Sequence, residues 1–217
     1  MNQRNYQKEL DGILTALQAE AKTPRLFLHS CCAPCSSYVL EYLSRYFEIT
    51  VYFYNPNIYP PEEYGKRVRE EERLIAEMNF VHPVNMIAAP YRPEEFYNIA
   101  RGLEKEPEGG RRCLKCYELR LREAARLAKE MGFDFFTTTL TISPLKKADK
   151  LNAAGEAAGR EFGVAFLPSD FKKKNGYKRS TELSREYGLY RQDYCGCVYS
   201  MREREKMGDH DLNGHPV

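Results

Sequence analysis

Seven cysteines are the residues of this chain whose type and spacing point most directly to chemistry. Their number is odd, so intrachain disulfides cannot pair them all, and 217 residues are enough for a hydrophobic core to stabilise the fold. Cysteines that serve only for packing would be scattered singly, whereas these cluster beside turn-forming residues. They form three groups: Cys31, Cys32 and Cys35; Cys113 and Cys116; and Cys195 and Cys197.

Two of these groups offer the thiolates of a metal site. Cys113 and Cys116 form a Cys-x-x-Cys pair at the start of a predicted helix, where the helix dipole favours ionised thiols. The adjacent Cys31 and Cys32 are a second pair, and two pairs supply the four thiolates that zinc or a [4Fe–4S] cluster takes. The pairs are too far apart for a zinc ribbon, so the whole fold must assemble the site.

The third group, Cys195-Gly196-Cys197, needs a separate interpretation. A disulfide across one intervening residue closes a small strained ring and should be easily reduced, which suits a redox-active pair. The same two thiols also suit a second metal, and the residues alone leave both alternatives open.

Alternating strand and helix signals indicate how these groups are positioned. The alternation predicts a single α/β domain in which helices flank a mostly parallel sheet. Such sheets bind ligands at the carboxyl ends of their strands, so we expect the metal site at that edge. The predicted strands are Arg25–His29, Ile49–Tyr54, Val84–Ala88, Asp134–Leu140 and Val164–Leu167, and the main predicted helices are 3–21, from Pro34 onwards, 61–78, 113–131 and 144–162.

Composition and charge limit the class of protein. Hydrophobic residues at 42% and charged residues at 29% are typical of a globular protein, and the net charge of +2 predicts no partner by itself. The first residues carry no signal region, and no apolar run approaches the ~18 residues of a membrane span. We therefore expect a cytoplasmic protein with no membrane partner. Its expected parts are a helical extension (1–24), a catalytic α/β domain (25–202) and a polar tail (203–217).

The cysteine groups belong to longer motifs that resemble one protein family. The motifs are His29-Ser30-Cys31-Cys32-Ala33-Pro34-Cys35, Asn55-Pro56-Asn57-Ile58, Cys113-Leu114-Lys115-Cys116-Tyr117, Ser169-Asp170-Phe171-Lys172-Lys173, Leu189-Tyr190-Arg191-Gln192 and Tyr194-Cys195-Gly196-Cys197-Val198-Tyr199-Ser200. In this order they resemble the QueH family of cobalamin-independent epoxyqueuosine reductases, over roughly residues 25–202. The resemblance also implies a fold similar to the nucleotide alpha-hydrolase or Rossmann-like class.

The resemblance implies reduction of epoxyqueuosine to queuosine at the wobble position (34) of tRNA, the last step of queuosine synthesis. It places a [4Fe–4S] cluster on Cys31, Cys32, Cys113 and Cys116, and it makes Cys195 and Cys197 a redox-active disulfide pair. An additional mononuclear iron is also associated with the family, and either Cys35 or the Cys195/Cys197 pair would help to hold it. The electrons would come from a low-potential donor that is ferredoxin- or flavodoxin-like.

The reaction also needs protons and an RNA-binding surface. Asp170 is the candidate acid or metal ligand, and its alternative roles are a helix cap or a surface ion pair. Basic residues gather in two stretches, 111–129 and 170–179, which adjoin the proposed site. The residues expected to contact tRNA phosphates are Arg111, Arg112, Lys172, Lys173 and Lys174, although an ordinary solvated charged surface is the alternative.

Two other functions fit parts of the sequence. A tRNA sulfur transferase combines a similar sheet with cysteine pairs or a cluster, but its ATP site uses a Ser-Gly-Gly-x-Asp-Ser loop where this chain has Ser30-Cys31-Cys32 and no glycine pair. A non-catalytic, zinc-stabilised RNA-binding module is the second alternative. An iron–sulfur absorption band at about 400 nm would distinguish the reductase from a protein that binds zinc alone.

Overall fold

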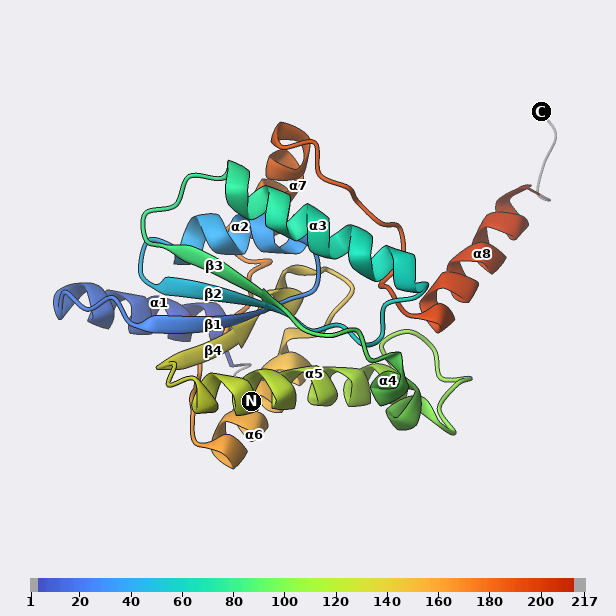
Figure 1. Ribbon diagram of the computed structural model, residues 1–217, viewed down its shortest axis with the longest axis horizontal. Coiled ribbons are helices and arrows are strands. Elements are labelled where there is room, and N and C mark those ends of the chain that lie inside the picture. Colours follow the sequence, from blue (N-terminus) through green and yellow to red (C-terminus); the bar gives the residue numbers. More distant parts are fainter. Residues whose placement is uncertain (1–3, 213–217) are drawn as a thin grey trace.

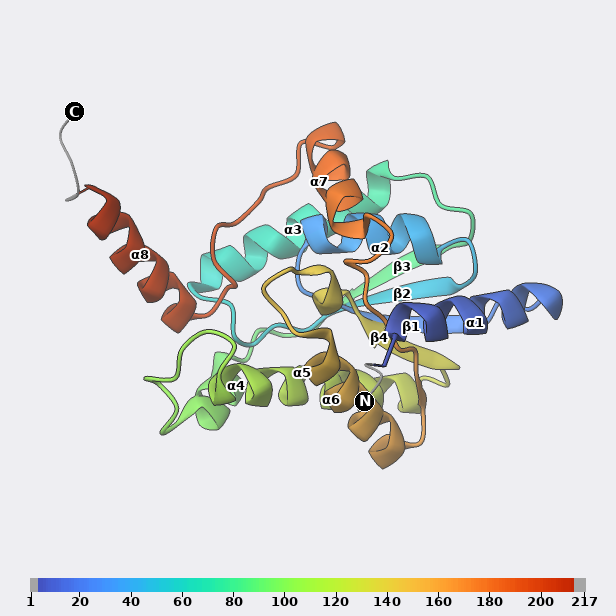
Figure 2. The same ribbon diagram turned by 180° about the vertical axis from the view of Figure 1, so that it is seen from behind.

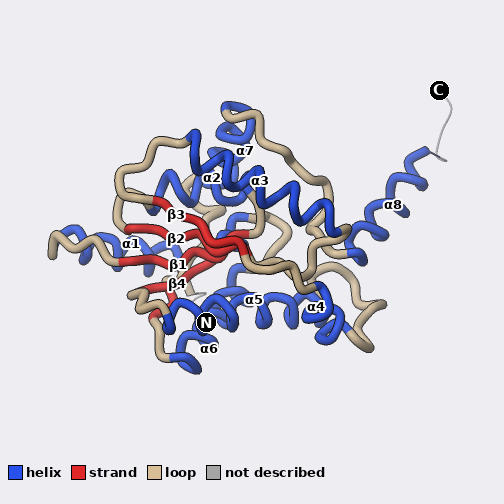
Figure 3. The backbone as a smooth tube through the Cα atoms, in the orientation of Figure 1, coloured by secondary structure: helices blue, strands red, loops and turns tan. Residues whose placement is uncertain are grey.

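Five parallel strands form one sheet at the centre of the computed structural model, which describes residues 4–212 and the side chains of residues 4–206 (Figures 1 and 3). The strand order is β3–β2–β1–β4–β5, and every neighbouring pair is parallel. This confirms the predicted α/β fold, with a sheet that is parallel throughout. The strands are β1 (Arg25–Ser30), β2 (Glu48–Phe53), β3 (Val84–Ala88), β4 (Phe135–Thr138) and β5 (Ala165–Phe166).

Helices cover both faces of the sheet. Helices α2, α3 and α7 lie on one face, and α4, α5 and α6 lie on the other (Figures 1 and 2). Helices α2, α3 and α4 each have a proline in their first turn, where its missing N–H costs nothing. The helices are α1 (Tyr6–Ala19), α2 (Ala33–Leu43), α3 (Pro61–Glu77), α4 (Pro93–Ala100), α5 (Arg111–Glu130), α6 (Ala148–Phe162), α7 (Gly176–Glu186) and α8 (Val198–Leu212), with a 3-10 turn η1 (Thr139–Ile142) after β4.

Alternation along β1 divides the core between the two faces. Leu26 and Leu28 pack with helix α2 and with Leu10 of α1, whereas Phe27 packs against the alanines of α5. A strand that is buried on both faces has a continuous apolar run in its sequence, which is why the sequence predicted this strand correctly. Because α1 contributes to the first cluster, it packs onto the α/β domain.

The carboxyl end of β1 is the topological switch point of the sheet. From β1 the chain passes through α2 to β2 on one side, while β4 on the other side is reached only after β3, α4 and α5. The loops that leave β1 and β4 therefore diverge, and the crevice between them is the usual ligand site of such sheets. Cys31 and Cys32 come directly after β1, and η1 comes directly after β4.

The C-terminal part differs most from the expected elements. No element was predicted for residues 171–202, where the structure has α7 and the start of α8. Helix α8 extends away from the α/β body (Figure 1), and the expected tail boundary at residue 203 falls inside it. Residues 213–217 lie outside the described residues. Among the described residues, no helix combines the length and apolar character needed to cross a membrane.

Candidate active site

Three thiols converge at the switch point. The sulfur atoms of Cys31, Cys32 and Cys35 all lie within 4.8 Å of one another, and those of Cys31 and Cys32 are 3.8 Å apart. Cys32 is the N-cap of α2, and the backbone N–H of Cys35 donates to the Cys32 carbonyl in its first turn. The Cys31 N–H donates to Thr139 Oγ1 at 3.3 Å, so the two diverging loops are joined at this point. Cys35, which the sequence left without a firm role, thus belongs to the same cluster.

The three thiols differ in acidity. Hydrogen bonds from the Cys32 and Cys35 thiols hold the pKa of Cys31 well below its usual range. Donating to Cys31 raises the pKa of Cys32 to about 12, and donation to both neighbours also raises the pKa of Cys35. Cys31 is therefore the most acidic thiol of the three.

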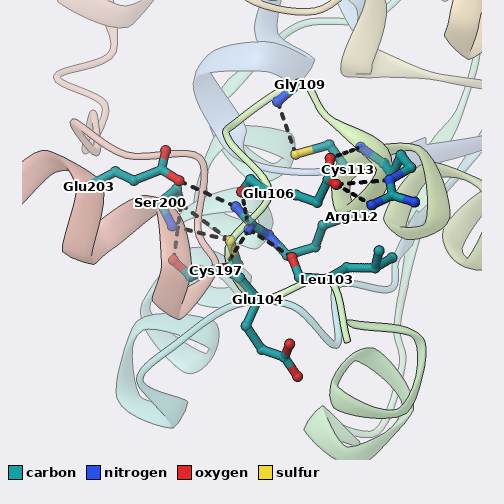
Figure 4. Close-up of polar contacts among 10 residues, drawn as sticks. Leu103, Glu104, Glu106, Gly109, Arg112, Cys113, Cys197, Ser200 and Glu203 are labelled. Atoms are coloured by element: carbon teal, nitrogen blue, oxygen red, sulfur yellow. Dashed lines mark hydrogen bonds and ion pairs between the residues drawn. The ribbon is translucent and has the colours of Figure 1, made fainter. Parts of the chain in front are cut away.

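A second pair of thiols lies at the start of α5. Cys113 Sγ accepts a hydrogen bond from the Gly109 N–H at 3.2 Å (Figure 4). Cys116 lies one turn further along the helix. Burial raises the pKa of Cys113 to about 11 and that of Cys116 to about 12. These two thiols are therefore protonated at neutral pH until a bound metal displaces the proton.

All seven cysteines are free, and they line two adjoining pockets. Cys31, Cys32 and Cys35 line the first, a cavity of about 200 Å³, which we call the cysteine pocket. A second, narrower pocket is lined by Cys113 and Cys116 together with the C-terminal pair. The walls of both pockets include Cys195, and that of the second includes Cys197. The fold thus brings together all the cysteines that the sequence placed in three separate groups.

Four cations line the cysteine pocket, and the charges of the cysteines act on three of them, Arg67, Arg120 and Lys146. Arg67 of α3 donates through Nε to Glu63 at 2.7 Å, while its Nη2 is buried without a hydrogen-bond partner. The other two are Arg120 of α5 and Lys146, which follows η1, and no ion pair of Lys146 occurs among the described residues. Burial opposes the charged form of all three, but the negative charge of the cysteines outweighs it and raises each pKa.

Arg120 also fixes the end of β1 through buried hydrogen bonds. Its Nε lies 3.2 Å from His29 Nε2, its Nη2 bonds to Asn55 Oδ1, and its Nη1 contacts Cys116 Sγ at 4.0 Å. His29 Nε2 also lies 3.1 Å from the Tyr54 carbonyl oxygen, and its Nδ1 lies 2.9 Å from Thr138 Oγ1, so both ring nitrogens have buried polar neighbours. Burial and the nearby Arg120 lower the pKa of His29 to about 3. His29 is thus a neutral core histidine.

Asp170 lies outside the two cysteine-lined pockets. Its carboxylate is 2.9 Å from Lys172 Nζ, and it lines a separate pocket near the N-terminus of α6. Lys146 lines both that pocket and the cysteine pocket, so Asp170 is separated from the thiols by this lysine.

The two arginines that precede Cys113 have different surroundings (Figure 4). Arg111 is exposed and pairs with Glu106 at 2.6 Å. Arg112 is buried, and its guanidinium donates to the carbonyls of Leu103, Glu104 and Glu106 (Figure 4). This is a structural role rather than the phosphate contact expected from the sequence, because a buried guanidinium cannot reach an RNA backbone. Further along α5, three basic residues pair with nearby glutamates: Lys115, Arg122 and Arg126.

The lysine run is similarly divided. Lys172 Nζ donates to the Thr141 carbonyl at 2.9 Å, and Lys174 pairs with Asp11 at 2.6 Å. Lys173 is exposed, and within residues 4–206 it forms no ion pair. One of the three expected phosphate contacts is therefore freely available, and the other two would have to leave internal partners.

Sequence reasoning missed the three cations of the cysteine pocket on which the charges of the cysteines act. Arg120 had a usable signal, since it lies four residues after Cys116 and seven after Cys113 and thus shares their face of the helix. Arg67 and Lys146 had none, because only the tertiary fold brings α3 and the segment after η1 to the cysteines.

The donor set fits an iron–sulfur site. Soft thiolate ligands select iron–sulfur clusters or zinc, and such ligands are present as the Cys31, Cys32 and Cys35 group and as Cys113 and Cys116 in the adjoining pocket. A thiolate-ligated cluster adds negative charge, and the unpartnered Nη2 of Arg67 is a buried donor at the wall where such charge would lie. The buried amide oxygen of Asn57, which also lacks a partner, lines the narrower pocket.

Comparison with known proteins gives one consistent result. The model of the family described as "Epoxyqueuosine reductase QueH" matches residues 26–203. Proteins of that name from Streptococcus pyogenes and Staphylococcus epidermidis are each 44% identical over 200 residues, which cover 91% and 90% of this chain and 78% and 84% of theirs. The protein of that name from Thermotoga maritima is 33% identical over 187 residues, which cover 83% of this chain and 92% of its own.

Proposed function

The chain belongs to the epoxyqueuosine reductase QueH family, and we propose that it reduces epoxyqueuosine to queuosine at the wobble position of tRNA. It is an oxidoreductase, and its site of action would be the cytoplasm, where tRNA is modified. The observation that carries the proposal is the convergence of seven free thiols with the buried Arg67 and Arg120 and the partly buried Lys146 at the switch point of the sheet.

The chemistry sets what the site must supply. Both C–O bonds of the epoxide break, the two carbons form a double bond, and the oxygen leaves as water. The balance is two electrons and two protons taken up for each epoxide. The sequence has no Gly-x-Gly-x-x-Gly fingerprint after a strand, so the chain has no recognisable site for a nicotinamide hydride donor.

We assign Cys31, Cys32, Cys113 and Cys116 as the ligands of a [4Fe–4S] cluster, which when bound supplies single electrons at low potential. Cys35 lies within reach of the same pocket and is our candidate for the ligand of an additional mononuclear iron. The cations Arg67, Arg120 and Lys146 would offset the negative charge of the thiolates.

The C-terminal cysteines have a different proposed role. Cys195 and Cys197 are assigned as the redox-active pair, and the position of Cys195 in the walls of both pockets supports this assignment. Gly196 adopts φ +132°, a conformation that favours glycine and turns the chain between the two thiols. The external reductant would be a low-potential protein of the ferredoxin or flavodoxin type.

Two residues are our candidates for stabilising the leaving oxygen and for supplying protons. Lys146 presents an ammonium to the cysteine pocket, where it would stabilise the negative charge that develops on the epoxide oxygen. Asp170, the acid predicted from the sequence, would supply protons from the adjoining pocket that Lys146 also lines.

The test replaces each proposed cluster ligand by serine in anaerobically purified protein. Each of the four variants should lose the absorption band at about 400 nm together with turnover of tRNA that contains epoxyqueuosine. Iron, sulfide and zinc are quantified in the same samples. Turnover that survives in a variant without iron would refute the assignment, and zinc in place of iron in the native protein would favour the RNA-binding module.

Cys197→Ser is the matched control for these variants. It removes a buried thiol from the same pair of pockets, but it should keep iron and the visible band while it loses multiple turnover. If it also loses iron, Cys197 is a metal ligand and not a member of a redox pair.

A further inference from the structure

The mouth of the cysteine pocket has exposed apolar side chains. Five large hydrophobic side chains are exposed among the described residues: Val81, Tyr97, Met131, Leu145 and Tyr177. Two of them, Leu145 at 76% exposure and Tyr177 at 42%, line the cysteine pocket. Exposing such side chains costs solvation free energy, so a pair at the mouth of a reactive pocket indicates a binding partner.

Tyr177 is presented from a rigid turn. Lys174 and Asn175 have φ of +53° and +61°, and the chain then enters α7 at Gly176. A Cβ on Gly176 would lie 2.0 Å from the Phe171 carbonyl oxygen, so only glycine fits there. The next residue is Tyr177, whose carbonyl accepts from Ser180 Oγ at 2.8 Å.

The Tyr177 ring is available for stacking. Within the described part of the chain, it forms no aromatic pair, and no cation lies over it. Helix α7 packs on α2, whose first turn holds Cys32 and Cys35 (Figure 2). The ring is therefore held beside the thiols by two packed helices, and its position does not depend on a mobile loop.

Cations surround this apolar pair. Lys146 and Arg191 line the same pocket. Lys147 follows Lys146 in the sequence, Lys178 follows Tyr177, and both of these lysines are exposed. None of the four forms an ion pair among residues 4–206. Aromatic rings set among unpaired cations are the usual platform for single-stranded nucleic acid, in which bases stack and phosphates meet the charges.

We infer that Tyr177 and Leu145 form a clamp that stacks on an unpaired nucleobase of the tRNA anticodon loop while the modified base lies in the cysteine pocket. This inference rests on the proposed function, since it takes tRNA as the substrate. The clamp holds the loop open and orients the wobble nucleotide toward the thiols.

The experiment uses the absence of tryptophan from this chain. Tyr177→Trp creates a single fluorescent reporter, and the holoprotein is titrated with an unmodified RNA hairpin of the anticodon arm. Stacking on a base should quench the emission as the hairpin saturates, which is followed separately through the anisotropy of a labelled hairpin. Met131→Trp is the matched control, because Met131 is 39% exposed but precedes β4 at the opposite edge of the sheet.

Affinity gives a second readout. Tyr177→Ala should weaken hairpin binding roughly 10-fold, Leu145→Ala by less, and Tyr177→Phe should bind like the wild type because it keeps the ring. Unchanged affinity of Tyr177→Ala, or unchanged emission at saturation, overturns the clamp.

Turnover measurements distinguish the clamp from the proposed function and from a docking site for the electron donor. If the Tyr177 variants show the expected changes in emission and affinity but the wild-type protein does not reduce epoxyqueuosine, the proposed function fails and the clamp stands. If Tyr177→Ala binds the hairpin normally but turns over slowly only at limiting flavodoxin, the surface docks the electron donor and the clamp is wrong.

Discussion

Glu71 should make the stability of this protein fall as the pH rises through neutrality. Its side chain is completely buried on α3, and within the described part of the chain neither carboxylate oxygen accepts a hydrogen bond. Burial raises the pKa of Glu71 from 4.5 to about 8, although the nearby hydroxyls of Ser36 and Ser30 limit the rise. We therefore expect Glu71→Gln, which is uncharged at every pH, to be more stable than the wild type at pH 7.

The sign and size follow from proton linkage. Below pH 4.5 both the folded and the unfolded protein hold the Glu71 proton, so the residue has no effect there. Between pH 4.5 and 8 only the folded state keeps it, and the free energy of unfolding falls by about 1.4 kcal/mol for each pH unit. At pH 7 the cost is about 3 kcal/mol, which in a chain of this size is roughly 6–12 °C in Tm.

The assay is anaerobic thermal unfolding of the holoprotein at pH 5, 6, 7 and 8. Comparing wild type and variant at each pH cancels the pH dependence that the cysteines and any bound metal contribute. Glu72→Gln, an exposed neighbour on the same helix, removes the same formal charge and should change Tm little at any pH. A constant difference in Tm between Glu71→Gln and the wild type from pH 5 to 8 would refute the reasoning.

The remaining predictions concern single side chains. Gly155→Ala should lower the free energy of unfolding by about 1–3 kcal/mol, because the new Cβ would lie 2.2 Å from the Phe166 ring. Gly12→Ala, in open space on α1, should raise the free energy of unfolding by about 1 kcal/mol in the same thermal assay. Lys173→Ala should reduce the slope of log Kd for tRNA against log salt concentration by about 0.7–0.9. Lys172→Ala should reduce this slope less, because the Lys172 ammonium already donates to the main chain. Equal slopes for the two variants would contradict the prediction. Lys146→Met should lower kcat by roughly 10²-fold with little change in KM, and Lys146→Arg should retain more activity; a change in KM alone would make Lys146 a binding residue only.

The elements that the sequence predicted are those that bury continuous apolar runs. Strand β1 was predictable because it is buried on both faces, and α5 because Leu121 and its alanines repeat at helical spacing. Helix α7 was missed because its buried face, apart from Leu183, consists of small residues such as Ser180 and Ser184. Small side chains allow close approach to α2 but leave no apolar period in the sequence.

Counting charges along the chain could not predict the RNA-binding surface. The stretches 111–129 and 170–179 have similar excess positive charge, yet the structure neutralises most of the first through glutamates on α5 and α6 and in the preceding loop. Arg112 and Lys173 each add one positive charge to such a count, but Arg112 is buried against main-chain carbonyls and Lys173 is exposed. Ion pairing is decided by tertiary neighbours, which the spacing of residues does not encode.

The cations of the cysteine pocket explain why the thiols can gather in one place. Several thiolates in a buried site repel one another, and with Cys31 as the thiolate the neighbouring thiols have raised pKa values. Binding a metal requires those protons to leave, which adds charge to a region that excludes water. Arg67, Arg120 and Lys146 come from three separate segments, and the neighbouring cysteines favour the charged form of each. The cations and the thiols thus stabilise each other's charged forms, so a site of this kind needs the whole fold and could not be built from the cysteine motifs alone.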